Sequence, residues 1–206
     1  TRNPFGVQKI QQVDASCGIM SRASNLIHKG QFSSREQFPW EAALSTDSEA
    51  NGTFIFRGSG CLISSKHVLA AAYSVSYLDQ ATKQLIPVET SRVRVFLGTT
   101  KYGDLSQPGS FMLNILKIVT HPKAREFSNS LSIYQVSIVT LQQEVTFSEY
   151  IRPVCLWPYA NDVSYIVGRD AYAVGYGRDE TGKNSETRKH VRVTVQDQNE
   201  CKIFES

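Results

Sequence analysis

Residues 58–75 read GSGCLISSKHVLAAAYSV, and this stretch is the strongest indication of the fold. Small and apolar residues dominate it as far as Ala72, a composition that is typical of a pair of buried strands. The apolar run then ends on Tyr73 and Ser74. A bulky tyrosine at the end of a buried strand is unexpected, and it raises the question of which residue this position would ordinarily hold.

The sequence on both sides of this stretch has the period of β-strands. Apolar residues alternate with polar ones in RVRVFL (92–97) and again in HVRVTV (190–195). Clusters of Gly, Pro, Asn and Asp separate such runs, and no stretch has a sustained helical period. We therefore predict an all-β protein. In the first run, the residues expected on one buried face are Val93, Val95 and Leu97.

The composition is that of an ordinary globular protein, with 206 residues, 41% hydrophobic and 20% charged. The net charge of +3 is too small to favour nucleic acid as a partner, and no apolar run is long enough to span a membrane. The 4 cysteines match no zinc-site spacing, so we expect neither a metal nor a cofactor. Dispersed cysteines together with the sequon at Asn51, the candidate glycosylation site, favour a secreted extracellular protein.

Five motifs occur along the chain in the order QFPWEAAL, GSGCLISSKHVLAAA, VRVFLG, YIRPVCLW and AYAVGYG. Together they resemble the trypsin/chymotrypsin-like serine protease family. The resemblance implies a trypsin-like double β-barrel, with the first barrel complete and the second truncated. It also implies boundaries: an N-terminal tail at 1–25 tethered by Cys17, and a partial protease domain at 26–206, made of a first barrel to about 145, a linker to about 160, and the start of a second barrel.

The resemblance gives Tyr73 a specific meaning. The family pattern T-A-A-H-C, whose histidine is the general base, falls on residues 70–74, so Tyr73 stands where that histidine is expected. Imidazole accepts a proton near neutral pH because its pKa is about 6.5, whereas a phenol titrates near 10 and is a poor base at pH 7. The alternative interpretation is that Tyr73 only packs at the end of a strand, and the two interpretations are compatible.

The other two catalytic positions also depart from the family pattern. Gln135 takes the place of the aspartate, and neither neighbour, Tyr134 or Val136, is acidic. A neutral amide can bond to an imidazole but cannot stabilise its positive charge. The nucleophile loop G-D-S-G-G does not occur in the sequence. We therefore expect no catalytic residue in this chain, and we expect a pseudoenzyme.

The resemblance also sorts the cysteines. It implies a disulfide between Cys17 and Cys155, and a lost partner for Cys61 at the position of Ser74. The usual partner of Cys201 falls after residue 206, so we expect the chain to be a fragment, or one chain of a cleaved molecule whose second barrel is covered by another chain. The activation bond falls at Leu26–Ile27, where no basic residue precedes the cut, so this site is expected to be degenerate.

We therefore expect a noncatalytic serine protease homologue of the arthropod type, which binds other extracellular proteins, namely proteases or their zymogens, as a cofactor, decoy or regulator in a proteolytic cascade such as those of innate immunity. The loops at 46–54 and 77–91 are the expected binding segments. One alternative is a serine endopeptidase whose catalytic residues lie outside this sequence. Another is a glycan- or surface-binding module that uses the scattered basic residues Arg94, Lys117, Lys123, Arg125, Lys189 and Arg192.

Overall fold

The structure is a computed structural model that describes residues 17–20, 31–47, 49–128, 131–157, 164–177, 182 and 185–197. Strands account for nearly all of its regular elements. Within the described residues, no helix has the length and apolar character that crossing a membrane would require.

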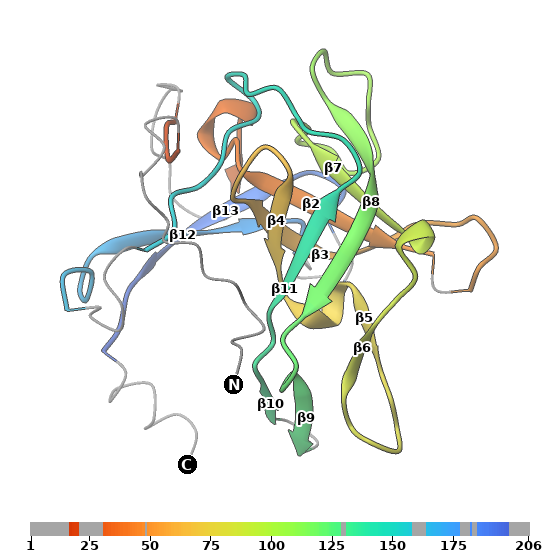
Figure 1. The fold of residues 1–206 in the computed structure, drawn as a ribbon. Coiled ribbons are helices and arrows are strands. Elements are labelled where there is room, and N and C mark those ends of the chain that lie inside the picture. Colours follow the sequence, from red (N-terminus) through yellow and green to blue (C-terminus); the bar gives the residue numbers. More distant parts are fainter. Residues whose placement is uncertain are drawn as a thin grey trace.

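The centre of the molecule is a closed antiparallel β-barrel, as Figure 1 shows. Each strand is hydrogen-bonded to the next around the barrel, in the order β11-β4-β3-β2-β7-β8. The all-β prediction and the complete first barrel are thereby confirmed. The strands of the barrel are β2 (Glu41–Thr46), β3 (Ile55–Leu62), β4 (His67–Ala70), β7 (Val93–Leu97), β8 (Phe111–Thr120) and β11 (Ser137–Leu141).

The barrel closes around the apolar faces that the alternating pattern predicts. Val93, Val95 and Leu97 are fully buried, as expected, because successive side chains of a strand point to opposite faces. Gly60 is required where β3 and β4 approach closely, since a β-carbon there would lie 2.7 Å from the carbonyl oxygen of Leu69. The interior is therefore a packed core, and it also includes Ala42, Leu44, Leu62, Val68, Ile115, Val139 and Leu141.

Short elements decorate the barrel. Two hairpins leave it, and all but the first residue of one of them lies in the segment 77–91 that the sequence predicts to be a binding loop. They are β5 (Ser76–Leu78) with β6 (Leu85–Pro87), and β9 (Arg125–Ser128) with β10 (Leu131–Ile133). Three single-turn 3₁₀ helices complete this part: η1 (Arg35–Gln37), η2 (Ala72–Ser74) and η3 (Thr90–Arg92).

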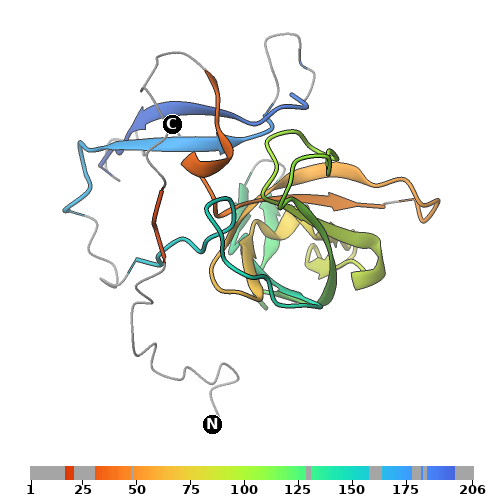
Figure 2. The ribbon, with the colours of Figure 1, turned by 90° about the horizontal axis from the view of Figure 1, so that it is seen from above.

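A second sheet lies beside the barrel and is built from a short strand that precedes the barrel and a hairpin that follows it. Its order is β1 (Gln31–Phe32), β13 (Lys189–Thr194) and β12 (Asp170–Gly175). Figure 2 shows the β12–β13 hairpin outside the barrel, with the segment that contains η1 between them. Val191 and Val193 alternate as predicted, but they are 45% and 42% exposed. The outer face of this sheet is therefore apolar and accessible within the described part of the chain.

A buried arginine joins this second sheet to the barrel. Arg188, 2% exposed, lies just before β13, and its guanidinium is 3.6 Å from the carboxylate of Glu41, which is 5% exposed and begins β2. The same guanidinium donates hydrogen bonds to the hydroxyl of Ser33 and to the carbonyl oxygens of Ser34 and Phe38. One side chain therefore ties the entering segment, the barrel and the hairpin together.

Glu41 is held by more than its ionic partner. Its carboxylate also accepts a 2.8 Å hydrogen bond from the hydroxyl of Ser59. Burial raises the pKa of the Glu41 carboxyl, and Arg188 and Ser59 oppose that rise by favouring the ionised form. The carboxylate and the guanidinium are thus mutually dependent, because either one alone would be a buried group without its main partner.

The N-terminal tail is attached to the linker that follows the barrel. The structure joins Cys17 and Cys155 in a disulfide, and the backbone N–H of Gly18 donates to the carbonyl oxygen of Pro153. This is the pairing that the family resemblance implies. Because the crosslink closes a loop across the whole barrel, it restricts the unfolded chain and favours the folded state.

The buried pair gives a stability prediction. Arg188→Met should lower the free energy of unfolding of the full-length protein by about 3 kcal/mol or more, because it leaves Glu41 buried without its cationic partner. Glu41→Gln should then cost less in the Arg188→Met background than in the wild type, with a coupling of about 1 kcal/mol or more. Urea unfolding of the four proteins in this cycle measures both quantities, and strictly additive effects would show that the pair is not coupled.

Candidate functional site

The turn after β4 presents Tyr73 at the surface. β4 ends at Ala70, and η2 then buries Ala72 and Ser74 while the side chain of Tyr73 remains 58% exposed. Ala72 and Val75, on either side of Tyr73, are both fully buried, and their burial fixes the position of the turn. Tyr73 is therefore held in place by its neighbours rather than by packing of its own ring.

Closure of the barrel brings Gln135 next to this turn. β11 pairs with β4 so that Ser137 faces Ala70, which places the residues before β11 beside η2. The backbone N–H of Ala72 donates to the carbonyl oxygen of Gln135 at 3.3 Å. The structure therefore brings together the two segments that the sequence assigns to the base and to its orienting acid.

The two side chains do not form a catalytic pair. The Oε1 atom of Gln135 is buried and has no hydrogen-bond partner among the described residues. Next to it, Tyr134 adopts a positive φ of 55° and its ring stacks on His121, with 4.7 Å between the centroids. The ring of His121 is thus engaged with Tyr134. A phenol and an amide therefore stand at the two positions that the sequence assigns to the base and to its orienting acid.

The structure corrects the expected position of the lost disulfide. Ser74 faces Gly58 and not Cys61: a β-carbon on Gly58 would lie 2.5 Å from Oγ and 3.4 Å from Cβ of Ser74. Gly58 and Cys61 are three residues apart on β3, so they point to opposite faces of the strand. The expectation that Cys61 would pair with position 74 is therefore wrong. The two residues that do face each other are Gly58 and Ser74, and neither is a cysteine.

Cys61 is instead a half-buried thiol in an unreactive setting. It lies opposite Glu41 on β2 and opposite Leu69 on β4. Burial raises the pKa of the Cys61 thiol, and the nearby Glu41 carboxylate raises it further. A thiol with a raised pKa is protonated at neutral pH and is a poor nucleophile. Cys61 therefore has the properties of a structural thiol rather than of a nucleophile.

A pocket of about 560 Å³ opens beside Tyr73. It is bounded by η2, by the β5–β6 hairpin and by the end of β2, so both segments predicted to be binding loops contribute to it. A pocket of this size falls within the range of about 300–1,000 Å³ that is usual for ligand sites. Its lining residues are Thr46, Arg57, Tyr73, Ser74, Ser76, Tyr77, Leu78, Leu85, Val88 and Arg92.

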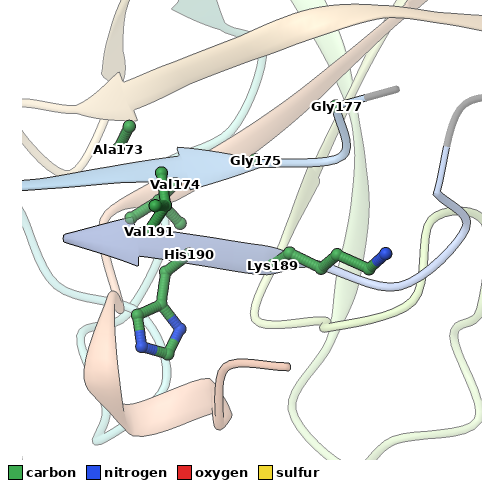
Figure 3. Close-up of a pocket in the computed structure, with 7 residues that line it drawn as sticks. All are labelled: Ala173, Val174, Gly175, Gly177, Lys189, His190 and Val191. Atoms are coloured by element: carbon green, nitrogen blue, oxygen red, sulfur yellow. The ribbon is translucent and has the colours of Figure 1, made fainter. Parts of the chain in front are cut away.

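A smaller and mainly apolar pocket of about 310 Å³ lies on the β12–β13 hairpin (Figure 3). Figure 3 shows Lys189 extending along β13, away from the imidazole of His190. That imidazole packs on Phe38 and Tyr172, with centroids 5.5 Å and 5.8 Å apart. These two polar side chains do not converge, so this pocket offers packing surface rather than a catalytic arrangement.

A comparison with protein families decides the identity of this fold. The Trypsin family model matches residues 27–205, which includes the whole barrel and the second sheet. This chain belongs to the trypsin family. The matched region contains the closed barrel, the turn at 70–74 that carries Tyr73, and the linker that carries Cys155.

Curated relatives from arthropods and vertebrates are similar to this trypsin-family chain. Serine protease gd of Drosophila melanogaster is 27% identical over 75% of the chain, and phenoloxidase-activating factor 1 of Holotrichia diomphalia is 26% identical over 90% of it. Haptoglobin of Bos taurus is 24% identical over 94%. The chain spans 27%, 50% and 42%, respectively, of the lengths of these relatives.

The other predicted site residues are dispersed. Asn51 is exposed in the loop between β2 and β3, where its side chain is within hydrogen-bond distance of Glu49. Of the scattered basic residues, Lys189 and Arg192 share β13 and the others lie elsewhere, and Arg192 is already paired with Asp170 at 2.6 Å. Leu26, Ile27 and Cys201 lie outside the described residues.

Some residues of the site were missed by sequence reasoning. A chain of hydroxyls below η2 links Ser76 to Thr120 at 3.2 Å and Thr120 to Ser137 at 2.7 Å. Arg57 and Arg92 were not singled out either, although they line the pocket beside Tyr73. Glu41 did leave a signal, because a charged residue inside the apolar motif FPWEAAL is unusual for a buried strand.

The facing pair gives a structural prediction for this trypsin-family turn. Gly58→Cys combined with Ser74→Cys should form a disulfide, because the Cβ atoms would lie close to the range of about 3.5–4.5 Å that a bridge requires. The crosslink should stabilise the full-length protein by about 3 kcal/mol. Intact mass before and after reduction, together with urea unfolding, measures both effects.

Ser74→Cys alone is the matched control for this prediction. It leaves Cys61 as the potential partner, and no bridge should form between them because they lie on different faces of β3. A disulfide between Cys61 and the introduced cysteine in that single variant would contradict the described register.

Proposed function

We propose that this chain is a noncatalytic member of the trypsin family that acts by binding other proteins. The observation that carries the proposal is the replacement of the base: η2 presents Tyr73, and the adjoining segment presents the neutral amide of Gln135. Proton transfer from a serine hydroxyl near neutral pH needs a group of suitable basicity, which a phenol does not supply. Among the described residues of this turn, neither Tyr73 nor Gln135 supplies such a group.

Binding is the function that the same turn can still serve. The pocket beside Tyr73 is lined by the two segments predicted to bind partners, and the barrel holds both of them on rigid strands. Sites on loops that a rigid scaffold positions are the usual places for recognition. We propose that the partners are extracellular proteases or their zymogens, and that the chain acts as a cofactor, decoy or regulator in a proteolytic cascade.

The names of the relatives support a role in a proteolytic cascade. One relative is named a serine protease and another a phenoloxidase-activating factor, so names from proteolytic and activating systems recur among the matches. A secreted location, glycosylation at Asn51 and a place in innate immunity belong to the same proposal. The arrangement of the exposed Asn51 loop is compatible with a glycan, because no core residue of the barrel lies in it.

The name of the first of these relatives favours a second candidate, a serine endopeptidase. It would require that a base reach the turn from outside the described residues. The two candidates differ in a simple measurement, since a binding protein leaves peptide substrates intact.

A single substitution tests the proposal. Tyr73→His in the full-length protein should restore no peptidase activity, because Gln135 still offers no carboxylate to orient and stabilise the imidazolium. Hydrolysis of a panel of chromogenic peptides with arginine, phenylalanine or alanine before the scissile bond should stay at the buffer rate for wild type and variant.

Tyr77→His provides the matched control, because Tyr77 is similarly exposed and lines the same pocket. Peptide hydrolysis above the buffer rate in the wild-type protein, or hydrolysis that appears with Tyr73→His and not with Tyr77→His, would contradict a noncatalytic role.

A further inference from the structure

The charged residues that line the pocket beside Tyr73 are all positive. Arg57 and Arg92 are its two charged lining residues, and neither aspartate nor glutamate is among the residues that line it. A concave site with positive charge and no lining carboxylate concentrates anions, because low-dielectric walls strengthen the local field. The charges of this pocket therefore favour an anionic ligand.

A β-bulge aims Arg57 at the pocket. On β2, Leu44 pairs with Gly58 and Ser45 pairs with Phe56, so Arg57 is the extra residue of β3 at the register shift. Bulges redirect the side chain that they contain, and they are common beside functional sites. Arg57 is exposed, and no hydrogen bond or ion pair to another described residue engages its guanidinium. The backbone of the bulge thus directs the guanidinium of Arg57 toward the pocket.

Arg92 is positioned in a different way. Its Nε donates a 2.7 Å hydrogen bond to the carbonyl oxygen of Asp47, and its own carbonyl accepts from the backbone N–H of Asp47. The carboxylate of Asp47 is turned to the backbone N–H groups of Asn51 and Gly52, at 3.1 Å and 2.8 Å. The loop that contains Asp47 therefore anchors the guanidinium of Arg92 at the pocket. The carboxylate of Asp47 is itself held by backbone N–H groups of the same loop.

The remaining walls are aromatic and aliphatic. Tyr73 and Tyr77 are 58% and 54% exposed, and the β5–β6 hairpin adds Leu78, Leu85 and Val88. Exposed tyrosines next to arginines are the composition that protein interfaces favour. A small inorganic anion would leave these apolar walls uncovered, whereas a peptide could contact both the walls and the two cations.

We propose that this pocket binds an acidic peptide segment of a partner protein. One carboxylate of the segment pairs with Arg57 and Arg92, and a neighbouring apolar side chain packs between Tyr73 and Tyr77. A sulfated glycan is less well matched, because it would need a track of basic residues, whereas Lys117 and Arg192 lie on other elements and Arg192 already pairs with Asp170. The inference rests on the proposed binding function and specifies the chemistry of its partner.

The test measures direct binding to the full-length protein. The probe is a fluorescein-labelled hexapeptide of alternating glutamate and leucine residues, and its matched control has glutamine in place of glutamate. Fluorescence anisotropy should show the acidic peptide binding about tenfold or more tightly than the glutamine peptide, because charge-assisted bonds to a guanidinium are lost. The difference should shrink as salt is raised.

Two variants with the same charge change locate the site. Arg57→Gln should weaken binding of the acidic peptide about tenfold, since it removes the bulge cation. Arg169→Gln should leave it unchanged, because Arg169 is exposed before β12 and does not line the pocket.

Several results would overturn the assignment. These are equal binding of the two peptides, no binding, or equal losses with Arg57→Gln and Arg169→Gln. Binding of a heparin octasaccharide that Arg57→Gln abolishes, in the absence of peptide binding, would assign the pocket to sulfated glycans instead. None of these results restores catalysis, so the noncatalytic proposal fails only in the hydrolysis measurement and the two outcomes are distinguishable.

Discussion

The arrangement of the molecule depends on the buried charge of Arg188. A guanidinium that is 2% exposed must have its hydrogen bonds and its charge satisfied inside the protein. Its partners come from the entering segment at Ser33, Ser34 and Phe38 and from Glu41 at the start of the barrel. The second sheet therefore cannot leave the barrel without exposing or orphaning this charge, and barrel and sheet behave as one unit.

The turn that carries Tyr73 is fixed by backbone contacts with neighbouring segments. The backbone N–H of Ala72 bonds to the carbonyl oxygen of Gln135, and Gly58 approaches Ser74 closely. This arrangement has a cost, because Ser74 Oγ and Gln135 Oε1 are buried without partners among the described residues. Each such atom costs about 1–3 kcal/mol, which the large barrel core offsets. In the binding function that we propose, this turn serves as a scaffold for the pocket beside it.

Local patterns in the sequence predicted the elements that depend on neighbouring residues. Strict alternation was sufficient for Val93 and Val95, and the order of short motifs was sufficient for the barrel. The Cys17–Cys155 disulfide was implied by the family resemblance. The contacts of Arg188 were not predicted, because Arg188 and Phe38 are 150 residues apart and no local pattern connects them. Cys61 was assigned to the wrong face because motif resemblance ignores the two-residue period of a strand. The pocket was also missed, since it forms only when β3, η2 and the β5–β6 hairpin meet.

The noncatalytic role proposed for this chain requires that its trypsin domain contain no activated serine. The most direct measurement treats the full-length protein with a serine-directed phosphonylating reagent, beside active trypsin, and locates any label by peptide mass spectrometry. The account predicts that trypsin is labelled and that no serine of this trypsin domain reacts, because Tyr73 and Gln135 cannot activate one. Stoichiometric labelling of a single serine in this domain would contradict it.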